Sequence, residues 1–108
     1  MKRGDLVTVA VSGDYGKPRP ALVIQSDAID GTESVLVCLL TTTLRDAPLH
    51  RLPLTAGEKT GLRQASQVMV DKIFAIRRDK CGAVIGRIDQ ATILALDRLL
   101  MFVVGVAD

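Results

Sequence analysis

The run Lys17-Pro18-Arg19-Pro20 places a strong cation between two residues that stiffen the backbone. A proline biases the residue before it toward extended geometry, so we expect Arg19 on a stiff segment that enters an apolar strand. A guanidinium held in this way loses less backbone entropy on binding an anion, and its fork matches pairs of phosphate oxygens. The pattern favours stabilisation of a phosphoryl centre that gains charge in its transition state. A salt bridge at a strand start is the alternative interpretation.

The loop around this arginine carries further candidates. Asp14 and Tyr15 stand a few residues before Arg19, and Tyr15 is the one tyrosine of the chain. It lies between glycines, where packing seldom needs an aromatic ring, so a nucleobase could stack on it. Lys17 could contact a neighbouring phosphate. The alternatives are a Tyr15 ring that caps the rim of a barrel and a solvated Lys17.

Hydroxyl and carboxyl groups follow two other apolar runs. Thr41-Thr42-Thr43 ends the most apolar predicted strand, where hydroxyls either donate to an oxyanion or cap the strand. Asp71 interrupts the run that ends at Val70, and Lys72 follows it. A carboxylate there could be a general base or an acceptor that reads a nucleobase. A surface pair between Asp71 and Lys72 is the alternative.

The remaining polar residues suggest less chemistry. His50 is the only histidine and is interpreted as solvated, and the charged run 77–80 as a solvated turn. Cys38 and Cys81 lie far apart in apolar surroundings, so we expect two buried, reduced thiols. One histidine and no CxxC spacing argue against a three-ligand catalytic zinc. We therefore expect neither a metal nor another cofactor.

Size and composition set outer limits. A length of 108 residues suits a single domain spanning 1–108, and 48% apolar residues can bury a real core. The net charge of +2 excludes a strongly basic nucleic-acid coat but allows a local basic patch. No apolar run approaches the ~20 residues of a membrane span, and no secretory signal follows the basic start. A cytoplasmic location is the expectation.

The elements that must position these residues are mostly strands. Short β-branched and apolar runs separated by turn formers predict strands over residues 5–12, 21–25, 34–41, 50–54, 67–76 and 82–88. Pro53 makes 50–54 an edge strand. Asp89 is a good N-cap for a helix over residues 90–104, whose apolar stripe should lie on the barrel and partly face another subunit. The fold class predicted is mainly β: a small antiparallel barrel with a C-terminal helix.

Five segments in order resemble the MazF/PemK family of toxin–antitoxin ribonucleases. They are Arg3-Gly4-Asp5-Leu6-Val7, Arg19-Pro20-Ala21-Leu22-Val23-Ile24, Leu36-Val37-Cys38-Leu39-Leu40-Thr41, Ser66-Gln67-Val68-Met69-Val70-Asp71-Lys72-Ile73 with Gly61-Leu62 before it, and Gly86-Arg87-Ile88-Asp89. The resemblance implies an SH3-like barrel that works as a homodimer. It further implies cleavage of single-stranded RNA without metal, in which the 2′-hydroxyl attacks the phosphate and leaves a cyclic phosphate and a 5′-hydroxyl.

The resemblance also implies roles for particular residues. Arg19 matches the family's catalytic arginine and Thr41 the threonine that assists it. Asp14 resembles an acidic residue proposed as a base in some members, and Asp71 matches one credited in others with catalysis or base recognition. We expect the RNA contacts to come from Tyr15, Lys17, Thr42 and Lys72. The implied partners are single-stranded RNA, with messenger RNA the first candidate, and an antitoxin whose acidic, partly disordered segment covers the basic groove. DNA would be contacted only indirectly, through the antitoxin complex, and no membrane is involved.

Two other functions stay open at this point. Gln25-Ser26-Asp27-Ala28-Ile29-Asp30 and Leu100-Met101-Phe102 resemble segments of the CcdB-like gyrase poisons, which share the barrel and bind a protein without cutting anything. That class uses C-terminal residues that include a tryptophan, and this chain has none. The other alternative is a barrel that has lost activity and only binds RNA or its antitoxin.

Overall fold

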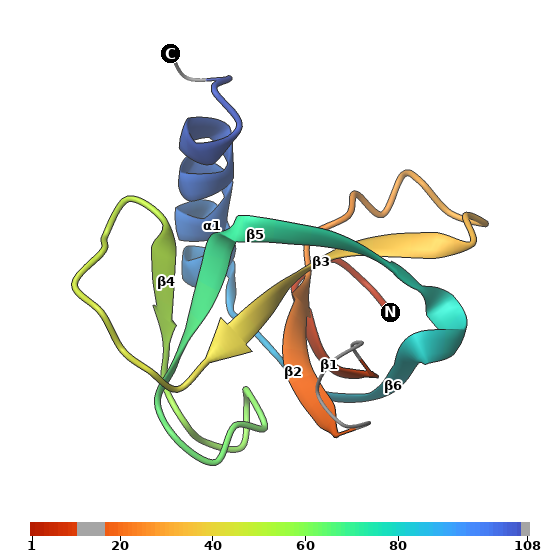
Figure 1. The fold of residues 1–108 in the computed structure, drawn as a ribbon, viewed down its shortest axis with the longest axis horizontal. Coiled ribbons are helices and arrows are strands. Elements are labelled where there is room, and N and C mark those ends of the chain that lie inside the picture. The colour runs from red at the N-terminus through yellow and green to blue at the C-terminus, as the bar shows by residue number, and fades with distance from the viewer. Residues whose placement is uncertain (11–16, 107–108) are drawn as a thin grey trace.

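The computed structural model describes residues 1–10 and 17–106, which form an antiparallel sheet and a C-terminal helix (Figure 1). The sheet order is β4-β5-β3-β2-β1-β6. This confirms the predicted fold class, a mainly β structure with one helix at its end. The bounds are β1 Asp5–Ala10, β2 Pro18–Val23, β3 Ser34–Thr41, β4 Arg51–Leu54, β5 Ser66–Arg77, the 3-10 turn η1 Arg78–Lys80, β6 Cys81–Arg87 and α1 Gln90–Val103.

A sharp bend in β5 curls the sheet. Leu40 of β3 lies opposite Val68, but Cys38 lies opposite Ile73, so residues 69–72 oppose the single residue Leu39. Extra residues on one strand bend it and increase its twist. The first half of β5 therefore pairs with β4, and its second half turns toward β6 (Figure 1). The unclear period of the sequence around residue 70 reflects this bend.

Apolar side chains pack on both faces of the central strands. One cluster lies under α1 and includes Leu6, Leu22 and the fully buried Leu96 of the helix. The other lies inside the curled half and includes Val9, Val37 and their neighbours. Burial on both faces explains why residues 34–41 read as one continuous apolar run.

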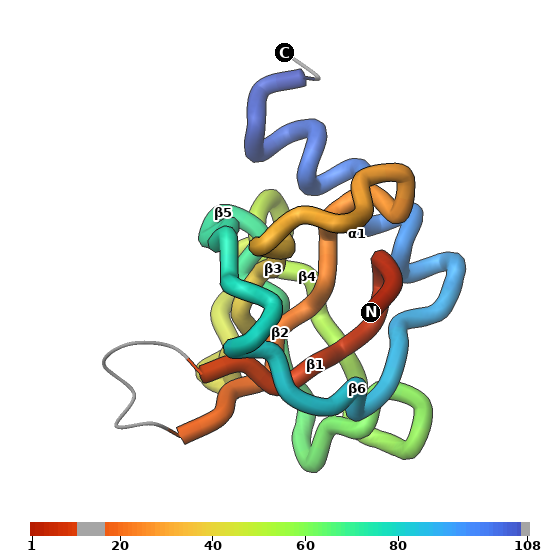
Figure 2. Tube along the Cα trace, turned by 90° about the vertical axis from the view of Figure 1, so that its right-hand side faces the viewer, coloured from red at the N-terminus to blue at the C-terminus, as the bar shows by residue number. Residues whose placement is uncertain are grey.

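The helix begins where the sequence predicts and leaves part of its surface bare. The side chain of Asp89 accepts a hydrogen bond from the Thr92 amide at 2.8 Å, which is the N-cap arrangement. Leu96 packs into the core, and Leu99, Leu100 and Val103 of the C-terminal half of α1 pack against it, while the C-terminal end of the helix projects beyond the strands (Figure 2). Leu94, Met101 and Phe102 are about half exposed. The part of the chain that the structure describes contains no helix long and apolar enough to cross a membrane.

Two expectations need correction. The second strand begins at Pro18, three residues earlier than predicted, because the extended segment around Arg19 pairs with β1. Cys81 is only partly buried, since it opens the edge strand β6, whereas Cys38 is fully buried as predicted. Both cysteines are free thiols, and burial is the main cause that raises the pKa of Cys38 to about 12.

Candidate functional site

One row of residues crosses the sheet at the end where β3 stops. Gln67 of β5 lies opposite both Thr41 of β3 and Pro53 of β4. The β2–β3 register pairs Ala21 with Leu39. Continuing this register by two residues places Arg19 opposite Thr41. Directly opposed residues of antiparallel strands project from the same face. Arg19, Thr41 and Gln67 therefore share the sheet face that points away from α1.

The side chain of Arg19 is held by a backbone acceptor next to Thr41. The amide of Ile24 donates to the Leu36 carbonyl oxygen. If the same pairing continued toward the start of β2, the amide of residue 20 would donate to the Leu40 carbonyl oxygen. Residue 20 is a proline and has no N–H. The Nη2 atom of Arg19 donates to the Leu40 oxygen instead, at 3.4 Å. The half-buried guanidinium is thus fixed beside the half-buried Thr41.

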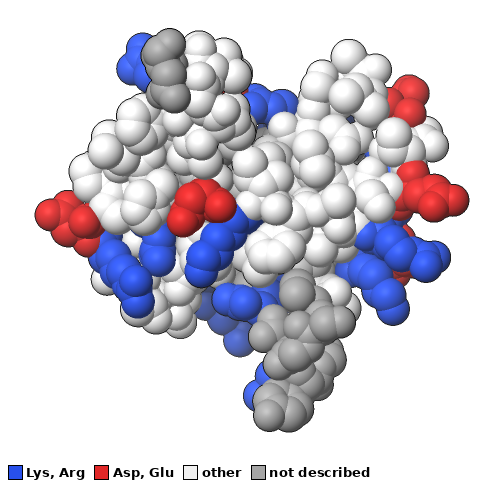
Figure 3. All heavy atoms as spheres, turned by 45° about the horizontal axis from the view of Figure 1, so that its top comes forward, with Lys and Arg blue, Asp and Glu red and all other residues white. Residues whose placement is uncertain are grey.

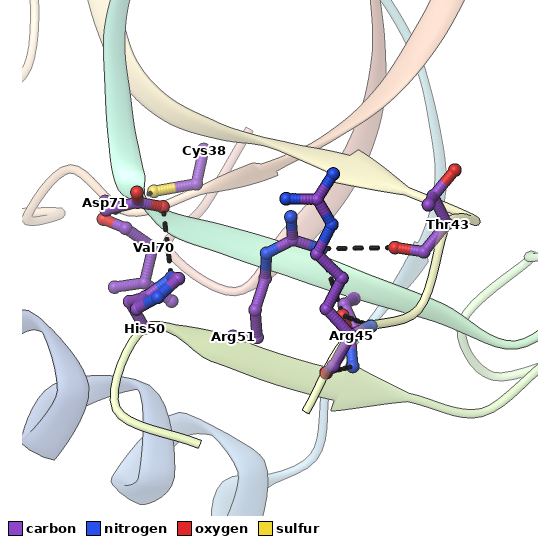
Figure 4. Close-up of polar contacts among 8 residues, drawn as sticks. Cys38, Thr43, Arg45, His50, Arg51, Val70 and Asp71 are labelled. Carbon is purple, nitrogen blue, oxygen red and sulfur yellow. Dashed lines mark hydrogen bonds and ion pairs between the residues drawn. The ribbon is translucent and has the colours of Figure 1, made fainter. Parts of the chain in front are cut away.

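A loop clamp organises the chain that follows Thr41. Gln67 donates from Nε2 to the Arg45 oxygen at 2.9 Å and accepts the Arg45 amide at 3.1 Å. Arg51 donates from Nη1 to the Gln67 Oε1 and to the Thr43 oxygen, at 3.0 and 3.2 Å. Figure 4 shows the Arg45 and Arg51 side chains projecting to the same side of β4 and β5, toward Thr43. These hydrogen bonds therefore hold the backbone of the loop after Thr41 at Thr43 and at Arg45.

Asp71 lies at the bend of β5, away from the row that contains Arg19. Its Oδ1 is 3.6 Å from the Nδ1 of His50, and the two side chains point toward each other (Figure 4). An Asp71–Lys72 pair, the alternative interpretation of these residues, is not among the ion pairs of the described residues, where Asp71 faces His50 instead. The solvated interpretation of His50 is wrong for its Nδ1, which is buried without a hydrogen bond in the described structure. Asp71 comes four positions after Gln67, within the segment 69–72 that bends away from β3.

The other predicted contact residues lie on the surface or outside the described range. Lys17, Thr42 and Lys72 are exposed. Asp14 and Tyr15 lie outside the residues that the structure describes. Gln67, Arg45 and Arg51 were missed, because nothing in the local sequence separates them from ordinary surface residues. Their position beside Thr41 depends on the β3–β5 register, which only the fold reveals.

The surface charge is uneven. On the face drawn in Figure 3, Lys and Arg side chains gather toward the lower left, and a mixed group of both signs lies at the right edge. Among the exposed charges, Arg77 pairs with Asp79 at 2.8 Å. Within residues 1–10 and 17–106, no three side chains of the metal-ligating types come together.

Comparison with known proteins decides the family. A model of the PemK-like, MazF-like toxins of type II toxin–antitoxin systems matches residues 2–104. The chain is also 41% identical to a probable endoribonuclease MazF of Mycolicibacterium smegmatis, over 99% of both chains. The chain belongs to this toxin family. The resemblance in sequence is thereby confirmed, and the gyrase-poison alternative is not favoured.

Solved structures of MazF toxins share the fold. An endoribonuclease in complex with its cognate antitoxin, from mycobacterial species, superposes with a TM-score of 0.80 at 23% identity, over 98% of this chain and 96% of that one. A MazF toxin of Mycobacterium tuberculosis gives the same TM-score at 24% identity, over 94% of this chain and 96% of that one. MazF toxins thus have the same curled sheet and helix as this chain.

Proposed function

We propose that this MazF-family chain is an endoribonuclease that cuts single-stranded RNA at a phosphate held by Arg19 and Thr41. The observation that carries the proposal is the Arg19–Leu40 contact, which places a half-buried guanidinium beside a half-buried strand-end hydroxyl. A relative 41% identical over the full length is named a probable endoribonuclease, which supports the same activity.

The reaction needs charge stabilisation more than covalent help from the protein. The ribose 2′-oxygen forms a bond to phosphorus, the bond to the 5′-oxygen breaks, and the products are a 2′,3′-cyclic phosphate and a 5′-hydroxyl. Arg19 binds the phosphate oxygens as negative charge builds on them, and the Thr41 hydroxyl donates a further hydrogen bond. Asp14 is the proposed base that takes the 2′-hydroxyl proton, and Arg19 gives a proton to the departing 5′-oxygen and recovers one from water. No metal is part of this scheme.

The surrounding residues would bind and read the RNA. Tyr15 offers a ring for base stacking, and Lys17, Thr42 and Lys72 offer exposed donors for the backbone. Asp71 lies apart from Arg19 within one chain, so we assign it to recognition of a nucleotide beside the cut. Its acidic oxygens accept hydrogen bonds from a base edge, and His50 lies beside the carboxylate.

The proposed partners are an antitoxin and a second copy of the chain. A mycobacterial endoribonuclease of the same fold has been solved with its cognate antitoxin, which supports an antitoxin here. The half-exposed apolar residues of α1 support a homodimer, because an uncovered patch of this kind is a common protein contact. We propose that 1–108 acts as one cytoplasmic domain that reaches DNA only through the antitoxin complex.

The test is incubation of the purified protein with a long single-stranded RNA in EDTA. The proposal expects discrete cuts whose downstream fragments accept a 5′ label from polynucleotide kinase without prior phosphatase treatment. Messenger and ribosomal RNA are compared to find the preferred class. Intact RNA in this assay would contradict the endoribonuclease, and stalled gyrase in a parallel assay would support the poison.

A further inference from the structure

A small cavity lies beside the candidate catalytic row and has no assigned role. It has a volume of about 190 Å³ and is formed by the loop after β3, the edge strand β4 and the start of β5; its lining residues are Arg45, Asp46, Ala47, Pro48, Arg51, Pro53 and Gln67. Pockets for whole drug-sized ligands begin at about 300 Å³. The cavity therefore suits one part of a longer ligand.

Two guanidinium groups lining this cavity have unused hydrogen-bonding capacity. The Arg45 side chain has no hydrogen bond or ion pair within the described residues, since Gln67 holds only its backbone. The Nε of Arg51 is buried and likewise has no partner there. A buried donor left unsatisfied costs free energy, so an acceptor that fills the cavity would be stabilised by it. Adjacent arginines with free donors suit a phosphate group.

The cavity lies next to the proposed cleavage site. Gln67, which lines the cavity, lies directly opposite Thr41. Arg51 bonds to the Thr43 oxygen, and the Thr43 amide bonds to the Thr41 hydroxyl oxygen at 3.1 Å. A strand of RNA with one phosphate at Arg19 and Thr41 would pass this cavity with a neighbouring nucleotide.

We propose that the cavity is a binding subsite for a nucleotide flanking the cut, whose phosphate is held by Arg45 and Arg51. The inference rests on the proposed RNA cleavage at Arg19. Pro48, Pro53 and Ala47 form the apolar wall against which the sugar or base packs. Asp46 is the one acidic residue in the lining, and its charge opposes the phosphate, so its removal should strengthen binding.

The experiment measures the affinity for an RNA whose cut position has been mapped, with a 2′-deoxy nucleotide at the cut so that no attack occurs. Arg45→Ala removes an exposed side chain that makes no hydrogen bond or ion pair within the described structure, so the fold is expected to survive. We expect at least about a tenfold loss of affinity. The slope of log affinity against log salt should fall by about 0.7, the value for one phosphate contact on a single strand. Arg51→Lys should keep the slope and lose affinity, because it keeps the charge without the fork.

Two matched variants complete the test. Asp46→Asn should bind the RNA more tightly, and Arg98→Ala, which removes an exposed arginine of α1, should bind as the wild type does. Equal affinities and slopes for the wild type and Arg45→Ala would overturn the subsite. The subsite would also be overturned if Arg45→Ala lost affinity for a polyglutamate peptide but not for the RNA. That result would assign the cavity to the binding of an acidic protein.

The same measurement separates the subsite from the proposed activity. A wild type that cuts RNA while Arg45→Ala binds it equally well refutes the subsite and leaves the activity standing. A wild type that cuts no RNA, but binds a long unmodified single-stranded RNA more tightly than Arg45→Ala does, refutes the activity and supports the subsite. A wild type that does not bind RNA contradicts both.

Discussion

Arg19 donates to the carbonyl oxygen of Leu40, the acceptor that would otherwise receive a backbone N–H from residue 20. Because Pro20 has no N–H, the ladder between β2 and β3 starts at Ala21 and leaves that oxygen to the guanidinium. The proline thus does more than stiffen the chain around Arg19. It leaves the Leu40 oxygen to accept the hydrogen bond from Arg19, next to Thr41.

Replacing Pro20 should separate stability from activity. In Pro20→Ala a backbone N–H becomes available to the Leu40 oxygen and competes with Arg19 for it. We expect unfolding stability to stay within about 1 kcal/mol of the wild type, since one ladder hydrogen bond is gained and backbone rigidity is lost. Single-turnover cleavage should fall by roughly tenfold, because the guanidinium loses its hydrogen bond to the Leu40 oxygen. Unchanged cleavage together with unchanged stability would show that the Leu40 contact does not position Arg19.

The loop clamp gives a second prediction. Gln67→Ala removes the hydrogen bonds to the Arg45 amide, the Arg45 oxygen and Arg51. We expect a loss of about 1–2 kcal/mol in urea unfolding and faster proteolysis within residues 42–49. Gln67→Glu serves as the control, because it keeps both acceptor contacts and gives up only the donor. A loop equally resistant to protease in all three proteins would argue against the clamp.

Local pattern predicted the elements better than it predicted the site. The run 34–41 reproduces β3 residue for residue, because burial on both faces leaves an uninterrupted apolar stretch. The helix start followed from Asp89, since an N-cap is a contact between near neighbours. Arg19 was found through its flanking prolines. Its acceptor at Leu40 was not, because that contact depends on a pairing across two strands.

The same reasoning explains the residues that were misjudged or missed. His50 reads as a solvated surface residue, and only the bend of β5 brings Asp71 to it. Gln67 acts through its place opposite Thr41, which no spacing along the chain reveals. The sequence thus identified candidate reactive groups. The contacts that support them depend on the β3–β5 register and on the bend of β5.

Asp71 should govern sequence choice more than rate. Asp71→Asn keeps the size of the side chain and removes the negative charge beside His50. Since Asp71 lies in the bend of β5 and not opposite Thr41, we expect turnover within about tenfold of the wild type and a changed set of cut sites. End mapping on one long RNA compares the two proteins. Complete loss of cleavage at an unchanged site, with the fold retained, would instead make Asp71 the general base.

The helix start should depend on pH through Asp89. Hydrogen bonds from the Thr92 side chain, and then from its amide, hold the pKa of Asp89 below the ordinary 3.8. A lowered pKa in the folded state means that the stabilising effect is present above pH 3.8 and is lost as pH falls through the folded value. The far-UV helix signal should therefore weaken below about pH 3.8 more in the wild type than in Asp89→Asn, whose cap does not titrate. Identical acid transitions would contradict the cap's contribution.

The central claim is that the guanidinium of Arg19 stabilises the reacting phosphate. The direct measurement is single-turnover cleavage by Arg19→Ala and Arg19→Lys, with circular dichroism to verify the fold and affinity for the 2′-deoxy RNA to verify binding. The account predicts a folded Arg19→Ala protein that still binds RNA and cleaves it roughly 10²–10³-fold more slowly, with Arg19→Lys in between. A folded Arg19→Ala protein that cleaves at the wild-type rate would contradict it.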